Sequence, residues 1–291
     1  MINIFLLNWN STELVLKSLS QLTKSTYSKF RVILINNFYS ETDLQRIREI
    51  HYQFVASFEI FLVENESNLG YAGGNNKGLK FLEENNLSGD ILILNPDILI
   101  SENTIFEMER RLVDGVGIVT VRMVNQQNKV ILDAIKLNGF IQHYVITQRD
   151  QIETEYAQGA CLLIKRRTIE NLGFFDERFF LYWEEVDFSL RVRKYGEQLI
   201  SITTTQVVRL KNDLIRQPPA FYYSVRNALL IKSKHPDHFN RLDYLIYINY
   251  MLILSLKFIT NFKILTLTLR NIYFAIKDSR NEIYYGRVES K

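Results

Sequence analysis

Residues 91–97 read Ile-Leu-Ile-Leu-Asn-Pro-Asp, a short run of branched apolar side chains that ends at an acid. A continuous apolar run of this length, closed by the turn-forming Asn95 and Pro96, is typical of a strand buried on both faces. Strands of this kind form parallel sheets that helices cover on both sides. Ligands bind beyond the carboxyl ends of such strands, which is where Asp97 lies.

Similar apolar runs recur along the chain and alternate with helical patterns. Further strands are predicted at residues 4–7, 32–35, 58–63, 118–124 and 160–164. The predicted helices cover residues 12–22, 44–50, 75–84, 188–195 and 221–234, and residues 125–158 resemble an edge or flap region. The alternation predicts an α/β fold with a mixed, mainly parallel sheet flanked by helices.

The charge of the chain is unevenly distributed, although its net value of +3 gives no case for binding nucleic acid. From Arg209 onward there are 14 Lys and Arg against 6 Asp and Glu. Residues 242–262 are rich in Leu, Ile and Tyr, but polar residues interrupt them, so they are not expected to span a membrane. Two interpretations remain open: helices lying on an anionic lipid surface, or a helical pair packed on the domain or on a second subunit, as in a homodimer.

Cys161 is the only cysteine, which excludes an internal disulfide framework and cysteine-based metal clusters. The first ten residues lack the basic start, the longer apolar stretch and the cleavage site of a signal peptide. A cytoplasmic protein is therefore the expectation. The four histidines form no tight metal pattern, and His235 and His238 are predicted to lie on the surface.

Two segments that follow predicted strands have the chemistry to hold a phosphorylated ligand. Asn95 and Asp97 can hold Mg²⁺ or Mn²⁺ when a diphosphate supplies further ligands, although Asn, Pro and Asp also favour plain turns. Asn68–Gly78 reads N-L-G-Y-A-G-G-N-N-K-G and opens a helix. Its glycines permit close approach of a ligand, and the helix amino terminus favours phosphate; alternatively, the loop only needs positive φ angles.

An acidic and aromatic segment, Gly173–Asp187, reads G-F-F-D-E-R-F-F-L-Y-W-E-E-V-D. Aromatic surroundings raise carboxylate pKa values, so Glu185 is a candidate general base that Glu184 and Asp187 help to orient. A glycosidase also uses two carboxylates, but adjacent residues such as Glu184 and Glu185 normally point in different directions. The structural alternative pairs Asp187 with Arg191 across one helical turn and buries the aromatic rings.

Together, these segments resemble the family 2 inverting glycosyltransferases, in particular the rhamnosyltransferase-like branch that builds bacterial surface polysaccharides. The resemblance covers roughly residues 2–227, in order along the chain. It rests on N-W-N at 8–10, N-L-G-Y-A-G-G-N-N-K-G at 68–78, L-N-P-D at 94–97, G-A-C-L-L-I at 159–164, the acidic segment at 173–187 and Y-Y-S-V-R-N at 222–227.

The resemblance implies a GT-A fold: a nucleotide-sugar half at residues 1–100, an acceptor half at 101–235 and a helical, basic and amphipathic extension at 236–291. It implies that Asp97 holds a divalent metal, Mg²⁺ or Mn²⁺, and that Glu185 deprotonates the acceptor hydroxyl, so that direct displacement inverts the anomeric carbon. Donor-binding residues are expected at Trp9, Asn10, Asn36, Asn68, Gly70, Asn76 and Asn95, and acceptor-supporting residues at Glu184, Asp187, Asp176 and Trp183.

Three positions depart from the family pattern. Asn36 and Glu185 stand where the family usually has Asp. The segment Gln206–Asn212 lacks the metal-associated His of the family. Either Asp97 and phosphates alone therefore hold the metal, or Arg209 or Lys211 supplies the positive charge.

The expected function is transfer of a sugar from a nucleotide donor to an oligosaccharide or lipid-linked acceptor at the inner face of the plasma membrane. The favoured donor is dTDP-rhamnose and the second is a UDP-hexose. The alternatives are a catalytically inactive, sugar-nucleotide-binding partner subunit and a glycoside hydrolase.

Overall fold

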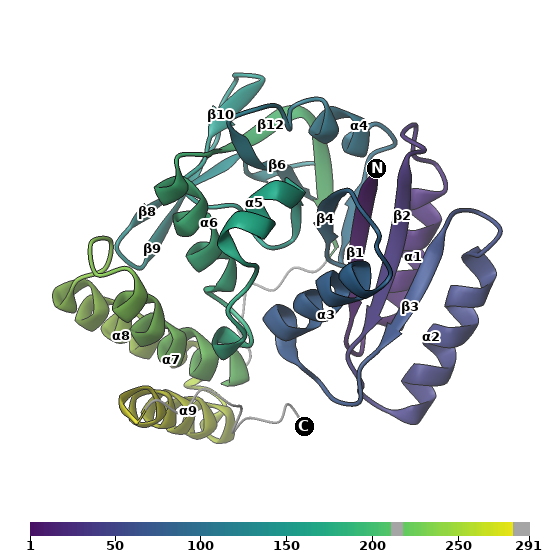
Figure 1. Ribbon diagram of the computed structural model, residues 1–291. Helices are drawn as coiled ribbons and strands as arrows, with labels where there is room; N and C mark the ends of the chain where they lie inside the picture. The colour runs from purple at the N-terminus through teal and green to yellow at the C-terminus, as the bar shows by residue number, and fades with distance from the viewer. Residues whose placement is uncertain (211–217, 282–291) are drawn as a thin grey trace.

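The computed structural model describes residues 1–210 and 218–281, and its centre is one large twisted sheet (Figure 1). The strand order is β10-β12-β6-β11-β4-β1-β2-β3, and within the described residues every strand on this path except β10 and β11 runs in the same direction. The mixed, mainly parallel sheet predicted from the sequence is therefore confirmed. The strands on this path are β1 (Ile2–Asn8), β2 (Phe30–Asn36), β3 (Ile60–Glu64), β4 (Asp90–Leu94), β6 (Val116–Asn125), β10 (Gln151–Glu153), β11 (Cys161–Ile164) and β12 (Gln198–Arg209).

Helices cover both faces of the parallel half of the sheet because alternate strand residues face two separate cores. Ile4 and Leu6 of β1 pack in one core, which also contains residues of α1 and α2, whereas Phe5 points to the other core, with α3, α5 and α6. Figure 1 shows α1 and α2 on one side of these strands and α3 on the other. The helices are α1 (Thr12–Leu22), α2 (Glu41–Phe54), α3 (Gly70–Glu84), α4 (Thr104–Glu109), α5 (Arg166–Leu172) and α6 (Glu184–Tyr195).

Helix α3 begins five residues before the predicted start, and its glycines serve packing. A Cβ atom at Gly74 would lie 2.6 Å from Leu7 Cδ1, and one at Gly78 would lie 2.6 Å from Ile35 Cδ1. At Gly70, where φ is +72°, a Cβ atom would collide with the carbonyl oxygen of Phe180. At these three positions the close approach is to the protein's own chain, because the helix lies directly on β1 and β2, while contact of Gly70 with a donor stays a prediction.

The region between β6 and β11, predicted as an edge or flap, contains short strands. β7 (Val130–Leu132) pairs with β6, while β8 (Ala134–Asn138) and β9 (Ile141–Val145) form a separate antiparallel hairpin. A further short strand, β5 (Ile98–Ile100), pairs with the end of β12. The β8–β9 hairpin extends toward the carboxyl-terminal helices (Figure 1).

Three helices form the carboxyl-terminal part: α7 (Pro218–Lys234), α8 (Arg241–Ser255) and α9 (Phe262–Arg280). Helix α9 is fixed to α7, because the Tyr222 hydroxyl donates to Asp278 (2.9 Å) and the Ser279 hydroxyl donates to the Arg226 carbonyl (3.0 Å). The apolar run predicted at 242–262 is split into α8 and a short 3₁₀ turn, η2 (Leu256–Phe258). Within residues 1–210 and 218–281, no helix combines the length and the apolar character needed to cross a membrane.

Candidate active site

The carboxyl ends of β1 and β2 meet in a buried polar cluster. Asn8 Nδ2 donates to Asn36 Oδ1 (2.7 Å) and to Asp43 Oδ2 (2.9 Å), and the Thr12 hydroxyl donates to the same carboxylate. Asn36 is fully buried, and its Nδ2 has no hydrogen-bond partner within the described part of the chain. Asp43, which the sequence did not single out, places a carboxylate beside the position where the family usually has Asp.

The loops after these strands carry an aromatic pair, of which Trp9 is half-buried. Trp9 and Tyr39 meet edge to face with their ring centroids 5.8 Å apart, and Tyr39 is exposed. Asn10, between β1 and α1, is exposed and has a φ of +48°. Aromatic rings at a strand end can stack on a nucleotide base, which is the role predicted for Trp9.

Asn37 links the start of α3 to the end of β2. Its amide nitrogen donates to Asn68 Oδ1 (3.2 Å) and to the Gly70 carbonyl (2.9 Å), and its oxygen accepts from Asn65 Nδ2 (2.9 Å). Asn68 also accepts from the Gly70 amide at 2.9 Å. The sequence predicted Asn68 as a donor ligand; here its side chain shapes the loop, while direct contact with a donor stays a prediction.

Asn76 connects α3 to the acidic segment. Its Nδ2 donates to the Phe175 carbonyl (2.8 Å) and to Glu177 Oε1 (3.0 Å), and its Oδ1 accepts from the Phe175 amide (3.3 Å). The Tyr71 amide donates to the Phe180 carbonyl at 2.7 Å. The amino terminus of α3 is thus docked on the acidic segment, which fixes the two parts of the site relative to each other.

Asp97 lies half-buried just past β4, beside the end of β12. The Leu210 amide donates to the Asp97 carbonyl (2.8 Å), and Arg209 is the register partner of Ile98. Arg209 Nε is buried and has no hydrogen-bond partner within residues 1–210 and 218–281. The alternative charge donor, Lys211, lies outside the described residues.

A divalent metal fits Asp97 only with help from a substrate. In the described residues, no group of three His, Cys, Asp or Glu side chains could hold a metal ion. Mg²⁺ is commonly bound through one or two carboxylates plus substrate phosphates, so a single carboxylate at a strand end suits a metal that arrives with a diphosphate. Asn95, two residues before Asp97, is fixed by its backbone amide, which donates to the Ala160 carbonyl at 2.9 Å.

The candidate base follows a turn in unusual backbone geometry. Phe180, Tyr182 and Trp183 have φ angles of +60°, +69° and +76°, although none of them is glycine. Each left-handed residue of this kind costs about 1 kcal/mol or more, and persists only where the surroundings hold it. Helix α6 begins directly after this turn, four residues earlier than predicted, so Glu184 and Glu185 form its first turn.

Two fully buried residues of α7, Arg226 and Asn227, hold this turn. Asn227 Nδ2 donates to the carbonyls of Phe179 (2.7 Å), Leu181 (2.8 Å) and Tyr182 (2.8 Å). One amino group of Arg226 donates to the carbonyls of Arg178 (2.7 Å) and Phe179 (2.8 Å). The Y-Y-S-V-R-N segment therefore supports the backbone that carries the candidate base.

Asn227→Ala should lower the free energy of unfolding by about 2–4 kcal/mol, because the carbonyls of Leu181 and Tyr182 lose this donor, the Phe179 carbonyl keeps only Arg226, and a buried side chain is truncated. Urea unfolding followed by circular dichroism measures the change. Asn249→Ala is the matched control: Asn249 is exposed, and its amide bonds only to the Leu245 carbonyl of its own helix, so the expected change is about 0.5 kcal/mol or less. Equal losses in the two variants would contradict the supporting role of Asn227.

Glu184 and Glu185 have different environments although they are adjacent. Glu184 is only 3 % exposed, and burial together with the negative charge of Glu185 raises its pKa well above the ordinary value for Glu. Glu185 is half-buried and lines a pocket. Two neighbouring carboxyl groups whose environments differ in this way can divide their roles, with the buried one keeping its proton and the other serving as base.

Tyr71 adds a hydroxyl to this pair. Burial and the nearby Glu185 and Glu184 raise the pKa of Tyr71 well above its usual value. Its hydroxyl donates to the Gly159 carbonyl, and the adjacent Ala160 carbonyl binds the Asn95 amide. The Gly159–Ala160 segment thus links the candidate base to the strand end that carries Asp97.

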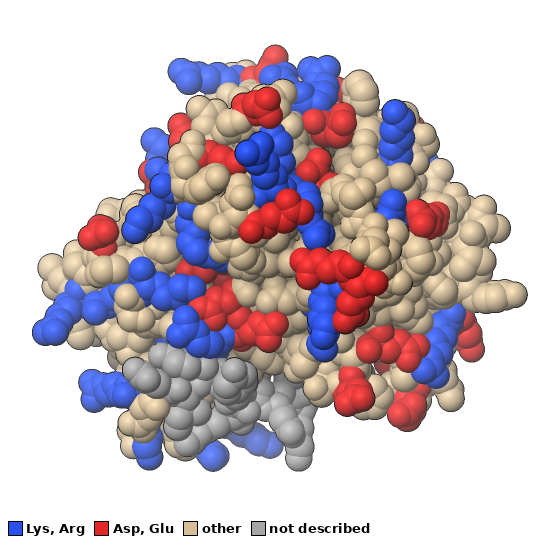
Figure 2. All heavy atoms as spheres, viewed as in Figure 1, with Lys and Arg blue, Asp and Glu red and all other residues tan. Residues whose placement is uncertain are grey.

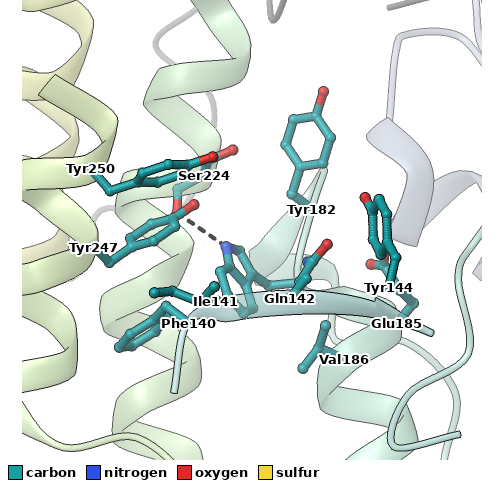
Figure 3. A pocket seen from close by; sticks show the side chains of 11 residues that line it. Phe140, Ile141, Gln142, Tyr144, Tyr182, Glu185, Val186, Ser224, Tyr247 and Tyr250 are labelled. Atoms are coloured by element: carbon teal, nitrogen blue, oxygen red, sulfur yellow. Dashed lines mark hydrogen bonds between the residues drawn. The ribbon is translucent and has the colours of Figure 1, made fainter. Parts of the chain in front are cut away.

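The pocket beside Glu185 has a volume of about 250 Å³, and its walls are mostly aromatic (Figure 3). Trp183, predicted to support the acceptor, is among its lining residues, and its Nε1 donates to the Ser224 carbonyl at 3.1 Å. Figure 3 shows Tyr247 and Tyr250 on the α8 side and Tyr144 with Glu185 on the opposite side. The other lining residues are Phe140, Ile141, Gln142, Tyr182, Val186 and Ser224.

The remaining predicted acids, Asp187 and Asp176, are bound by cations away from this pocket. Asp187 is fully buried and pairs with Arg191 (3.0 Å), Lys234 (2.9 Å) and His235 (2.8 Å). Burial alone would raise the pKa of Asp187, but the hydrogen bond with His235 and the positive charges of Arg191 and Lys234 lower it. Asp176 pairs with Arg178 (2.6 Å) and Lys234 (2.7 Å). The prediction that His235 lies free on the surface is wrong, because it joins α7 to α6.

Comparisons with known proteins define the fold and the family. Solved structures of similar fold include GalNAc-T7 with UDP, GalNAc and Mn²⁺ (TM-score 0.61, 12% identity, 78% of this chain and 47% of that chain). The mannosyltransferase PcManGT from Pyrobaculum calidifontis with GDP-Man and Mn²⁺ has a TM-score of 0.61 at 14% identity and covers 99% of this chain and 76% of its own. S. aureus TarS 1–349 with UDP-GlcNAc has a TM-score of 0.57 at 12% identity, over 100% and 95% of the two chains. The fold is therefore that of the GT-A glycosyltransferases.

Residues 4–173 match the family described as glycosyl transferase family 2, and the chain belongs to this family. It is 27% identical over 165 residues to the low-salt glycan biosynthesis hexosyltransferase Agl10 of Haloferax volcanii, over 54% of this chain and 52% of that protein. It is 31% identical over 72 residues to an N-acetylglucosaminyl-diphospho-decaprenol L-rhamnosyltransferase of Mycobacterium tuberculosis, over 25% of this chain and 24% of that protein. The matches thus span about half of one curated relative and a quarter of the other, and the family match ends before Glu184 and Glu185.

Proposed function

We propose that the protein is an inverting glycosyltransferase, which moves a sugar from a nucleotide-diphosphate donor to a hydroxyl of a lipid-linked or polysaccharide acceptor. The observation that carries this proposal is the position of Glu185. It lines an aromatic pocket and lies close to Gly159, and the neighbouring Ala160 carbonyl accepts a hydrogen bond from the Asn95 backbone amide at the strand end of Asp97. One base beside one donor site is the arrangement that a single displacement requires.

In the proposed reaction, the Glu185 carboxylate takes the proton of the acceptor hydroxyl. The acceptor oxygen then forms a bond to the anomeric carbon of the donor, while the bond from that carbon to the diphosphate oxygen breaks and the nucleoside diphosphate leaves. Glu184 keeps its proton, since burial and Glu185 raise its pKa. Asp97 would hold a divalent metal, Mg²⁺ or Mn²⁺, which when bound offsets the negative charge on the diphosphate.

The proposed donor is dTDP-rhamnose, with a UDP-hexose second. Support comes from the names of the relatives, a rhamnosyltransferase and a hexosyltransferase, and from the UDP, UDP-GlcNAc and GDP-Man bound to structural neighbours. Trp9 and Tyr39 would stack on the base. The polar cluster of Asn8, Asn36 and Asp43 would lie near the ribose and would supply, through Asp43, the carboxylate that Asn36 lacks.

We also propose that the protein acts at the inner face of the plasma membrane. Helix α8 exposes apolar side chains to solvent, among them Leu242, Leu245, Ile246 and Ile253. Residues 241–281 contain six Lys and Arg but only two Asp and no Glu, and Figure 2 shows Lys and Arg along the edge where α8 and α9 lie. Exposed apolar and cationic side chains together favour an anionic lipid surface over a second protein subunit.

One specific observation favours a second candidate function, that of an inactive partner subunit that binds sugar nucleotides. Asn36 stands where the family usually has Asp, and its fully buried amide nitrogen is without a partner in the described residues. Such a protein would bind donors but transfer nothing.

The test is a titration of purified protein with dTDP-rhamnose and UDP-glucose, with and without Mn²⁺, followed by transfer to N-acetylglucosaminyl-diphospho-polyprenol. We expect one donor to bind more tightly with Mn²⁺ and its sugar to appear on the lipid with inverted configuration. Donor binding with no transfer to any acceptor would favour the inactive subunit. Release of free sugar from polysaccharide without a nucleotide would favour a hydrolase.

A further inference from the structure

The pocket beside Glu185 connects two parts of the chain that lie far apart in sequence. Glu185 belongs to the first turn of α6, while Tyr247 and Tyr250 belong to α8. Tyr247 is buried, whereas Tyr250 is 49% exposed and Tyr144 is 57% exposed. The pocket is therefore lined by α8, by the β8–β9 hairpin and by the start of α6, and its exposed tyrosines, Tyr144 and Tyr250, mark its solvent side; Figure 3 shows Glu185 across the pocket from Tyr247 and Tyr250.

The lining of this pocket suits a sugar ring. Its volume of about 250 Å³ is near the lower end of small-molecule pockets, which span roughly 300–1,000 Å³. Four tyrosines contribute ring faces and hydroxyls, and Gln142 adds an amide. Aromatic faces with a few polar groups match a pyranose, which has apolar C–H faces and a rim of hydroxyls.

The rim of the pocket continues into the exposed apolar face of α8. Ile246 and Ile253 are four residues before and three residues after Tyr250, so they are its neighbours on the helix surface, and both are exposed. Lys257, seven residues after Tyr250 in the turn that follows α8, is also exposed. A sugar in the pocket would therefore have apolar and cationic protein surface beside it, which complements an apolar chain attached through a phosphate or diphosphate.

We infer that this pocket is the acceptor subsite and that it binds the sugar of a lipid-linked acceptor, which enters along the exposed face of α8 from the membrane surface. This inference rests on the proposed function. It assigns the sugar to Tyr250, Tyr247 and Tyr182, next to Glu185, and the lipid to Ile246 and Ile253. Tyr250 would contact both the sugar and the start of the lipid chain, since it lies on α8 at the mouth of the pocket.

The inference is tested with two acceptors that share N-acetylglucosaminyl diphosphate: a polyprenyl form in phosphatidylglycerol-containing vesicles, and a water-soluble form on a short alkyl chain. Tyr250→Ala should raise the KM of both acceptors about tenfold through loss of the ring face, while Tyr250→Phe stays within about twofold. The double variant Ile246→Ser with Ile253→Ser should raise the KM of the vesicle acceptor alone. The donor Kd should be the same in all variants.

Tyr52→Ala is the matched control, because Tyr52 is an exposed tyrosine of α2, remote from the pocket. If Tyr250→Ala leaves the acceptor KM as unchanged as Tyr52→Ala does, the inference is wrong although the proposed function stands. If the wild-type protein transfers no sugar, the proposed function fails. Binding of the soluble acceptor, followed by tryptophan fluorescence, then decides: binding that Tyr250→Ala abolishes supports the subsite, and no binding overturns it.

Discussion

Glu185→Gln should lower kcat for sugar transfer by about 10²- to 10⁴-fold, the range typical of a lost general base, while the Kd of the donor stays unchanged. The amide keeps the shape of the side chain at the pocket wall, but it cannot accept the proton of the acceptor hydroxyl. Single-turnover transfer from dTDP-rhamnose to the lipid-linked acceptor measures the rate, and calorimetry measures donor binding.

Glu184→Gln is the matched variant, and the expected result is a kcat within about fivefold of the wild-type value. Burial and the charge of Glu185 raise the pKa of Glu184 well above its ordinary value, which favours the neutral acid, and an amide resembles a neutral acid in shape and charge. The pair therefore separates a base from a structural neighbour at adjacent positions. Equal losses in the two variants, or full activity in Glu185→Gln, would remove Glu185 from its proposed role.

Much of the fold was predictable from local sequence patterns. The apolar runs at 4–7, 32–35 and 91–94 lie within β1, β2 and β4, and the helix predicted at 12–22 matches α1 at both ends. Burial on both faces leaves a continuous apolar run in each parallel strand, which is why such strands can be recognised without knowledge of their partners. Once the strands are recognised, their carboxyl ends are known, and Asp97 is predicted to lie just beyond one of them.

The helix starts were less predictable, since tertiary contacts decide them. Glycine is unfavourable within a helix, so residues 70–74 did not read as helical. They are helical because Gly74 and Gly78 let α3 lie directly against Leu7 and Ile35. Likewise, α6 begins after three residues of positive φ in a turn that the buried Arg226 and Asn227 of α7 help to hold in place.

The residues of the candidate site that lie in recognisable local motifs could be predicted from the sequence. Those that reach the site from distant segments could not. Asp97 and the Glu184–Glu185 pair stand next to strong local patterns. Tyr247 and Tyr250 reach the pocket only because α8 folds back onto the β8–β9 hairpin, and no spacing in the sequence relates them to Glu185. The contact between His235 and Asp187, which are 48 residues apart, also forms only in the folded chain, and no local pattern predicts it.

Asp97→Asn should reduce kcat/KM by about 100-fold or more and should abolish any tightening of donor binding by Mn²⁺. The physical reason is the sparse ligand set: the described residues contain no group of three acidic, His or Cys side chains that could hold a metal, so the proposed site depends on this one carboxylate, and loss of charge stabilisation of this kind costs about 10²–10³ in rate. Donor titration with and without Mn²⁺, alongside transfer kinetics, measures both effects. Asp114→Asn, a change at an exposed acid paired with Lys165, is the control.

Arg209→Gln distinguishes metal from guanidinium as the charge that faces the diphosphate. Arg209 is the register partner of Ile98 at the end of β12, and its buried Nε has no hydrogen-bond partner in the described residues, so it is placed to take over this role if no metal binds. With a metal at Asp97 we expect Arg209→Gln to cost about tenfold or less, and EDTA to remove most of the wild-type activity. Full activity in EDTA, combined with loss of activity in Arg209→Gln, would transfer the role to the arginine and would explain how the chain dispenses with the histidine that its family usually has.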